Sequence, residues 1–339
     1  MKFGLKEVMF IMKQGVTAKD VAKLAGVSQS SVSRVYFEGA SVSAKTKEKV
    51  LAAAEELGYR PNEFARSLIT NQSKIIGLVM KGVQNPFYPQ VLKLFTTSLK
   101  KHGYSVLFVY TNNDEIQKED IEILFNYNVA GVVITDASLS LSVTEDFIKY
   151  QIPLVLFNRK IDNNKFYSVC CNNYEASKRI AEFLLSIGCT KMIYISGNEN
   201  TSTSREREKG FSAMLKGSKV HYQKYSSDYT YEGGYNIACE IIEEKQLPDA
   251  FFVANDIMAL GVVDALKDHQ IAIPNETKVI GFDNIEMAAW PTYNLTTWEQ
   301  PITEMVEETV KYLLNELEEY SGEAKNLEID GSLILRKTT

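Results

Sequence analysis

Residues 16–35, VTAKDVAKLAGVSQSSVSRV, predict the fold of the N-terminal part of the chain. Thr17 suits the N-cap of a first helix, whose apolar residues recur at helical spacing until a glycine ends it. Ser28 suits the N-cap of a second, shorter helix that turns Val32 and Val35 inward. Two helices joined by a turn of about four residues that contains glycine form the helix-turn-helix unit.

The outer face of the second helix is polar and carries no Asp or Glu. Its residues are Gln29, Ser30, Ser33 and Arg34. In the major groove glutamine can pair with adenine and arginine with guanine, while serine hydroxyls can donate to phosphates. The face therefore favours DNA binding. The alternative is a helical bundle without a nucleic-acid role, because similar helix pairs are common.

A third helix is expected to begin at Ser43, with Thr46 in its first turn, and to stop at Gly58. Its apolar stripe would close a small core with the first two helices. The residues expected in the two longer helices are Val21, Ala22, Leu24 and Ala25 in the first, and Val50, Leu51, Ala54 and Leu57 in the third.

The charge of the chain is divided unevenly. The whole chain has a net charge of −6, yet residues 1–74 hold 12 Lys and Arg against 7 Asp and Glu. The remainder holds 25 basic against 36 acidic residues. A basic head on an acidic body can bind phosphate while the body stays away from it.

The segment YRPNEFARSLIT, residues 59–70, predicts a short helix after Pro61 that Asn62 can cap. Ala65 and Leu68 belong to an apolar face that no neighbouring sequence covers. Such a short helix is marginal alone, so it would form only against another surface. A DNA minor groove is one candidate, in which an inserted leucine could wedge between base steps.

Beyond residue 74, short apolar runs alternate with amphipathic stretches, which predicts βαβ units and parallel sheets. Such apolar runs are expected to be covered on both faces. The expected strands are Ile75–Met80, Ser105–Tyr110, Gly131–Thr135, Pro153–Phe157, Met192–Ser196, Ala250–Ala254 and Val279–Phe282. The expected helices include Gln90–His102, Glu175–Ile187 and Asp256–His269.

Polar and aromatic residues follow several of these strands. Because ligands of open α/β sheets bind at the carboxyl ends of strands, we expect these residues to meet in one cleft. Amides, carboxylates, an arginine fork and aromatic faces together suit a sugar. Each residue also has a plainer interpretation, as a helix cap, a turn, a core aromatic or a surface ion pair. The segments are Asn85–Tyr88, Asn158–Arg159, Gly197–Arg207, Asn255–Asp256 and Asp283–Asn284.

The sequence lacks the motifs typical of a membrane span, a metal site and several common enzyme classes. No apolar run reaches the roughly 18 residues of a membrane span. The four cysteines form no CxxC pair, and they show no metal-ligand spacing with the three histidines. No phosphate-binding loop, G-x-S-x-G or HExxH occurs. We therefore expect a cytoplasmic protein with reduced thiols, no catalytic residues, no metal and no cofactor.

The chain resembles the LacI/GalR regulators over about residues 16–339. The blocks that carry the resemblance are residues 16–35, SAKTKEKVLAAAEELGYRPNEFARSL (43–68), NPFY (85–88), STSREREKGF (202–211), FVANDIMALGVVDAL (252–266), VIGFDNIEMA (279–288) and LTTWEQPITEM (295–305). The resemblance implies a helix-turn-helix headpiece and an α/β body. That body has two Rossmann-like parallel-sheet subdomains of the periplasmic-binding-protein type.

The resemblance also implies domain bounds. Residues 1–15 would be a disordered N-terminal extension, within which Met12 is an alternative start. Residues 16–60 would form the headpiece and 61–74 the hinge helix and linker. Residues 75–339 would form the effector-binding and dimerisation domain. Its subdomains would span about 75–171 with 299–331, and about 172–298 with 332–339.

The resemblance assigns DNA contacts by position. The family often has Asn just after the recognition helix, where this chain has YFEG at 36–39, so a phosphate contact there is in doubt. Base contacts are implied for Gln29, Ser30 and Arg34. Backbone contacts are implied for Thr17, Ser28, Ser31, Ser33, Ser43, Thr46 and Tyr59. Minor-groove contacts are implied for Asn62, Ala65 and Leu68, with Leu68 as the wedge.

The resemblance assigns effector contacts to Asn85, Phe87, Asn158, Arg207, Tyr229, Asn255 and Asp283. Two positions depart from the family pattern. Asn158 stands where Asp is frequent, and Trp298 stands where a small or aliphatic residue is usual. We therefore expect a cleft of altered shape, and the resemblance does not fix which hydroxyls are read.

The implied function is that of a homodimeric repressor on pseudo-palindromic operator DNA, whose affinity a sugar-like effector controls. No leucine heptads follow Arg336, which favours a dimer over a tetramer. The alternatives are a regulator controlled by a protein co-repressor, a sugar-binding protein of a transport system, and an enzyme such as a sugar kinase. Effector identity, operator sequence and the direction of the response are not encoded in any recognisable motif.

Overall fold

The computed structural model describes residues 16–36, 41–60, 73–81, 84–111, 113, 115–135, 138–160 and 165–339. The chain divides into two compact units, Met1–Ser73 and Lys74–Thr339. The expectations for residues 1–15, and for Asn62, Ala65 and Leu68, lie outside the described residues. No helix in the described ranges is long and apolar enough to cross a membrane.

The described residues of the first unit form three helices around a small core. Glycines with φ of 65° and 66° end the first and third helices, as expected for left-handed C-caps. The helices are α2 (Ala18–Ala25), α3 (Gln29–Val35) and α4 (Ala44–Leu57). The buried core residues are Val21, Ala22, Ala25, Val32, Val50, Ala53 and Ala54.

Two leucines expected in that core are exposed instead. Leu24 is 47% exposed and Leu51 is 43% exposed. Leu24 directly precedes the buried Ala25 and Leu51 directly follows the buried Val50, so the rotation of about 100° per residue turns each leucine away from the core. Ala53, which was not expected in the stripe, is buried in α4. The core therefore packs through small alanines, which let the helices approach closely.

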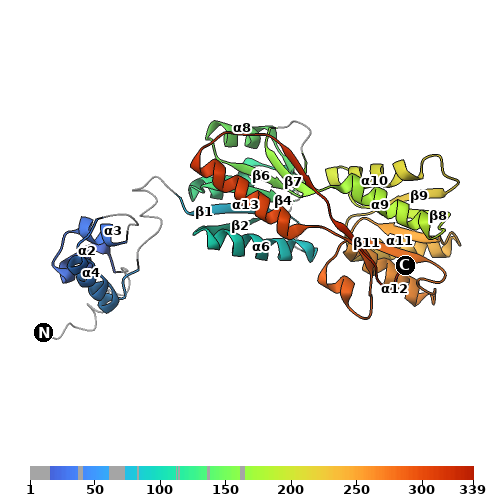
Figure 1. Cartoon of the computed structure of the whole chain (residues 1–339), viewed down its shortest axis with the longest axis horizontal. Coiled ribbons are helices and arrows are strands. Elements are labelled where there is room, and N and C mark those ends of the chain that lie inside the picture. The colour runs from blue at the N-terminus through green and yellow to red at the C-terminus, as the bar shows by residue number, and fades with distance from the viewer. Residues whose placement is uncertain are drawn as a thin grey trace. The chain divides into compact units, whose positions relative to one another are not determined.

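The second unit begins with a six-stranded parallel sheet in the order β13-β7-β6-β4-β1-β2. We call this sheet and its helices the first lobe (Figure 1). Its strands are β1 (Ile75–Met80), β2 (Ser105–Tyr110), β4 (Gly131–Thr135), β6 (Leu154–Phe157), β7 (Tyr167–Cys171) and β13 (Asn326–Ile329), with the small pair β3 (Glu115–Ile116) and β5 (Ser138–Leu139). Its helices are α6 (Phe87–Lys101), α7 (Lys118–Asn126), α8 (Leu141–Lys149) and α13 (Ile302–Glu318).

Alternate residues of the central strands face opposite helix layers. Leu78 packs in the cluster with Val91 and Phe95 of α6. Its neighbour Val79 packs in a separate cluster with Leu124 of α7. The sheet is therefore covered on both faces, as its continuous apolar strands require.

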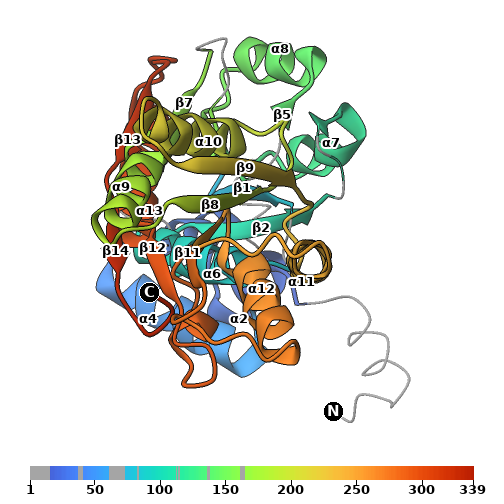
Figure 2. The same ribbon diagram turned by 90° about the vertical axis from the view of Figure 1, so that its right-hand side faces the viewer.

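The second lobe is another six-stranded sheet, in the order β14-β12-β11-β10-β8-β9, in which only β14 is antiparallel. The helix pairs α9–α10 and α11–α12 cover opposite faces (Figure 2). The strands are β8 (Lys191–Ser196), β9 (His221–Ser226), β10 (Ala250–Val253), β11 (Lys278–Asp283), β12 (Thr296–Glu299) and β14 (Ser332–Ile334). The helices are α9 (Asn173–Ser186), α10 (Ser202–Leu215), α11 (Tyr231–Glu243), α12 (Asp256–Asp268) and the 3-10 turn η1 (Glu286–Ala289).

The chain crosses between the lobes three times: after β7, after β12 and after β13. These crossings lie close together because β7 pairs with β13 and β12 pairs with β14. Neither lobe is thus built from one continuous stretch of sequence.

The seven predicted strands are confirmed to within one residue at either end. The expectation that all are covered on both faces is wrong for β2, where Phe108 and Tyr110 are exposed. The reason is that β2 is an edge strand with a single partner, β1. β7, β9, β12, β13 and β14 were not predicted, because polar residues interrupt their apolar ones, and the two-residue strands β3 and β5 were not predicted either.

Candidate functional site

The predicted recognition face lies on α3 and is open to solvent. Gln29, Ser30, Ser33 and Arg34 are all exposed, while Val32 on the opposite side is fully buried. The helix is thus anchored by one face and free along the other. That geometry allows its polar side chains to reach a groove.

The hydroxyl residues around α3 are ordered by short-range hydrogen bonds. Ser28 caps α3 and accepts from the backbone N–H of Ser31 at 3.2 Å. The Ser28 hydroxyl also lies 2.8 Å from that of Ser30 and 2.9 Å from that of Ser31. These side chains are therefore arranged at the helix N-terminus, whose free N–H groups favour phosphate.

Three other predicted backbone contacts, Thr17, Ser43 and Thr46, also lie at helix starts, whereas Tyr59 follows the end of α4. Thr17 caps α2 in a reciprocal capping box with Asp20, and hydrogen bonds from Thr17 lower the pKa of the Asp20 carboxyl. Ser43 caps α4 and accepts from the backbone of Thr46 at 3.2 Å. Tyr59 is half-buried, and its ring centroid lies 6.0 Å from that of Tyr36.

The second unit holds a cavity of about 1060 Å³ between its two lobes. Its lining includes every one of the seven residues predicted to contact an effector. Six of them follow strands or lie at helix starts, and Arg207 lies in the second turn of α10, so the cleft lies where the carboxyl ends of the strands meet. The residues are Asn85, Phe87, Asn158, Arg207, Tyr229, Asn255 and Asp283.

Arg207 is buried and tightly held. Its Nε donates to Asn173 Oδ1 at 2.8 Å, and its Nη1 donates to the carbonyl of Ala254. Its guanidinium lies 3.6 Å from the ring centroid of Phe282. With three sides fixed, the guanidinium presents a pre-oriented donor to the cleft.

Asp283 joins the lobes at the floor of the cleft. Its carboxylate accepts from Gln300 Nε2 at 2.7 Å and from Asn85 Nδ2 at 3.5 Å. Its backbone φ is 122°, and Asn158, Tyr229 and Asn284 also have positive φ. Strained backbone of this kind gathers at binding sites, where surrounding contacts hold it in place.

The side-chain amides of Asn158 and Asn255 both line the cleft, but they differ in their hydrogen bonding. Asn255 caps α12 by accepting from Met258 N at 3.1 Å, so the capping interpretation holds alongside its place in the lining. Asn158 is buried, and its Oδ1 has no hydrogen-bond partner within the described part of the chain. A buried acceptor without a donor is costly, and a ligand hydroxyl could satisfy it.

The two aromatic members of the set differ in accessibility. Phe87 is almost fully buried at the start of α6 and belongs to the core as well as to the lining. Tyr229 covers Gly197, where a Cβ atom would lie 2.0 Å from Tyr229 Cζ. The glycine therefore lets the tyrosine ring lie flat against the loop that follows β8.

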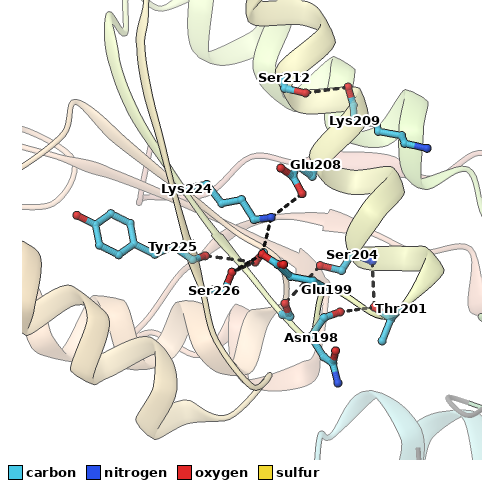
Figure 3. Close-up of polar contacts among 12 residues, drawn as sticks. Asn198, Glu199, Thr201, Ser204, Glu208, Lys209, Ser212, Lys224, Tyr225 and Ser226 are labelled. Atoms are coloured by element: carbon cyan, nitrogen blue, oxygen red, sulfur yellow. Dashed lines mark hydrogen bonds and ion pairs between the residues drawn. The ribbon is translucent and has the colours of Figure 1, made fainter. Parts of the chain in front are cut away.

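That loop, residues 197–201, is held by a polar cluster on β9 and α10 (Figure 3). Lys224 lies 2.7 Å from both Glu199 and Glu208, and Ser226 Oγ donates to Glu199 at 2.6 Å. Thr201 Oγ1 donates to the carbonyl of Asn198 at 2.9 Å. The hydrogen bonds from Lys224 and Ser226 lower the pKa of Glu199, which keeps this anchor charged.

Asp256 is fully buried next to the residues that line the cleft. Burial, and then the charge of Asp283, raise the pKa of Asp256 to about 7. Thr297 Oγ1 donates to one carboxylate oxygen at 2.6 Å and the backbone of Ile285 to the other at 2.9 Å. A Cβ atom at Gly281 would lie 2.1 Å from this carboxylate, so the position needs glycine.

Two residues that hold the cleft, Asn173 and Gln300, were not predicted from the sequence. Asn173 follows β7 and Gln300 follows β12, two strands that were not identified. Recognising those strands would have pointed to both. Trp298, for which we expect an effect on cleft shape, is not itself among the residues that line the cleft. It is buried and stacks behind Phe282, with ring centroids 6.5 Å apart.

A helix-turn-helix with a free polar face, together with a two-lobed α/β unit around a polar cleft, defines a class of bacterial DNA-binding regulators. The family "Bacterial regulatory proteins, lacI family" matches residues 17–62. The "Periplasmic binding protein-like domain" matches residues 181–339.

Whole-chain similarities agree with these matches. The ribose operon repressor of Halalkalibacterium halodurans is 30% identical over 325 residues, covering 95% of this chain and 97% of the relative. The transcriptional repressor PurR of Pasteurella multocida is also 30% identical, with coverages of 95% and 98%. The structure of the Lac repressor dimer bound to operator and the anti-inducer ONPF has a TM-score of 0.84 and 26% identity, covering 96% of this chain and 99% of that one.

The chain belongs to the LacI family of transcriptional regulators. The predicted family and fold class are thereby confirmed.

Proposed function

We propose that the protein is a homodimeric repressor that binds a pseudo-palindromic operator through α3, and that a sugar-like effector in the cleft controls operator affinity. The similarity to the Lac repressor dimer on its operator supports the arrangement on DNA. In this arrangement the protein acts in the cytoplasm and performs no catalysis.

On the DNA side, Gln29, Ser30 and Arg34 read base edges. The hinge residues Asn62, Ala65 and Leu68 enter the minor groove, with Leu68 as the wedge. The exposure of the α3 face supports this assignment. The remaining headpiece residues bind the DNA backbone: Thr17, Ser28, Ser31, Ser33, Ser43, Thr46 and Tyr59.

On the effector side, the supporting observation is the cavity itself. Seven residues spread from Asn85 to Asp283 line one cavity between two lobes. Asn158 offers a buried acceptor that has no partner in the described ranges, Asp283 offers further acceptors and Arg207 a fixed donor. The faces of Phe87 and Tyr229 suit the apolar side of a sugar ring. The cleft thus offers partners for several hydroxyl groups at once.

A thermal-shift screen of the full chain against neutral sugars, sugar acids and phosphorylated sugars tests the proposal. A ligand that binds the folded state raises the melting temperature with concentration by mass action. We expect at least one sugar-type compound to do so with the wild type. Asp283→Asn should lose this shift, whereas Asp146→Asn, which removes a carboxylate on α8, should keep it.

Any compound found this way is then added to the protein on duplexes selected from a random pool. We expect operator affinity to change in the wild type but not in Asp283→Asn. A sugar-dependent shift that survives Asp283→Asn unchanged would remove this cleft from the proposal.

A further inference from the structure

A single lysine connects the two lobes at one edge of the cleft. Lys160 follows β6 in the first lobe, and its Nζ lies 2.9 Å from Glu206 Oε1 on α10 of the second lobe. The same Nζ also pairs with Glu328 on β13 of the first lobe. The side chains of Lys160 and Glu206 are 16% and 25% exposed, so the pair between the lobes is partly shielded from solvent and salt.

Two hydrogen bonds reinforce this edge. The backbone N–H of Lys160 donates to Ser202 Oγ at 3.0 Å, and Arg159 Nη1 donates to Thr203 Oγ1 at 3.1 Å. All of these bonds run from the segment after β6 to the first turns of α10. The second lobe is therefore held here through one helix end.

The charges of the cluster are not balanced locally. One ammonium faces two carboxylates, and Glu206 Oε2 is buried without a hydrogen-bond partner among the described residues. Without Lys160, Glu206 and Glu328 would repel each other across the boundary between the lobes. The lysine thus turns a repulsive contact between the lobes into an attractive one.

We infer that Lys160 is a clamp between the lobes, which holds them at the separation seen here and sets how readily the cleft opens. The inference rests on the proposed function only for its regulatory consequence. An effector that separates the lobes must break the Lys160–Glu206 pair, whereas one that draws them together preserves it. The strength of this pair then sets part of the coupling between effector and operator.

The cluster supplies its own matched control. Glu206 and Glu328 are both glutamates paired with Lys160, but only Glu206 belongs to the opposite lobe. Replacing either with Gln removes one carboxylate charge with little change of shape. Only the replacement at Glu206 removes an attraction between the lobes.

The test measures the separation of the lobes in the effector-free full chain. Tyr110 and Asn200 line the cleft from opposite lobes and are exposed, so Tyr110→Cys and Asn200→Cys can carry spin labels. The background is Cys239→Ala, because the other three cysteines are buried. Labelled chains are diluted into unlabelled protein, so that pulsed dipolar spectroscopy records distances within one chain.

We expect a narrow distance distribution in the otherwise unmodified chain and a shift to longer distances in Lys160→Met. Glu206→Gln should shift in the same direction, and Glu328→Gln should not. The double variant Lys160→Met/Glu206→Gln should be shorter than Lys160→Met alone, since the repulsion is gone.

An unchanged distribution in Glu206→Gln, which is the mildest variant, would overturn the clamp. An equal shift in Glu328→Gln would do so as well, because that pair lies within one lobe. No effector enters the measurement, so failure of the clamp leaves the thermal-shift result standing.

Discussion

The recognition face of the headpiece and the cleft of the second unit are both polar. The hydrogen bonds that hold their side chains, however, join residues at very different separations in the sequence. On the headpiece, Ser28 bonds to Ser31 three residues away. In the cleft, Asn85 bonds to Asp283 across 198 residues, and Arg207 bonds to Asn173 across 34. The recognition face can thus form with its own helices, whereas the cleft exists only after both lobes have folded.

We expect the largest difference in stability between substitutions of two arginines, Arg207 in the cleft and Arg34 on α3. In Arg207→Met, two buried oxygens lose charged donors, and each such hydrogen bond contributes about 1.5–3 kcal/mol. We expect the free energy of unfolding of the second unit to fall by about 3 kcal/mol or more. Arg34→Met, on the exposed face of α3, should stay within about 0.5 kcal/mol of the wild type.

Urea denaturation of both variants gives these values. Equal losses of unfolding free energy in Arg207→Met and Arg34→Met would mean that the buried contacts of Arg207 contribute no more stability than the exposed side chain of Arg34.

The pH dependence of stability should come from the cleft rather than the headpiece. Asp256 has a pKa of about 7 when folded, against about 4 for an exposed aspartate. Between these values the folded chain retains a proton that the unfolded chain has lost, so this residue's contribution to stability falls as pH rises. The loss is about 1.4 kcal/mol for each pH unit of that window.

Denaturation at about pH 5 and about pH 8 checks this contribution by comparing the wild type with Asp256→Asn. The difference between the two proteins isolates Asp256 from every other group that titrates. If the free energy of unfolding of the wild type falls no more steeply with pH than that of Asp256→Asn, the pKa of Asp256 is not raised in the folded chain.

The smallest expected effect is local to the headpiece. Ser28→Ala removes the N-cap of α3 and should destabilise the headpiece by about 1 kcal/mol. Ser33→Ala, in the middle of the same helix, is the matched control and should cost little. Circular dichroism of the full chain during thermal unfolding can follow the headpiece transition. A loss as large in Ser33→Ala would mean that capping does not set the helix start.

The same contrast between short-range and long-range contacts explains which elements and residues could be predicted from the sequence. Capping residues and glycine helix ends predicted the headpiece helices, because the signals lie within a few residues of the structures they form. The seven strands with continuous apolar runs were predicted equally well from local sequence. Asn173 and Gln300 were missed because β7 and β12 carry polar residues among their apolar ones. The Lys160 cluster could not be predicted, since it joins residues 46 and 168 positions apart.

Sequence selection from a random duplex pool at low ionic strength, using full-length wild type, Arg34→Ala and the control Lys23→Ala, tests whether α3 reads an operator sequence. We expect wild type and Lys23→Ala to enrich the same two-fold symmetric motif. Arg34→Ala should bind duplex without that preference, because a bidentate base contact contributes about 1–3 kcal/mol of discrimination. Enrichment of the same motif by Arg34→Ala, or of no motif by the wild type, would contradict this function of α3.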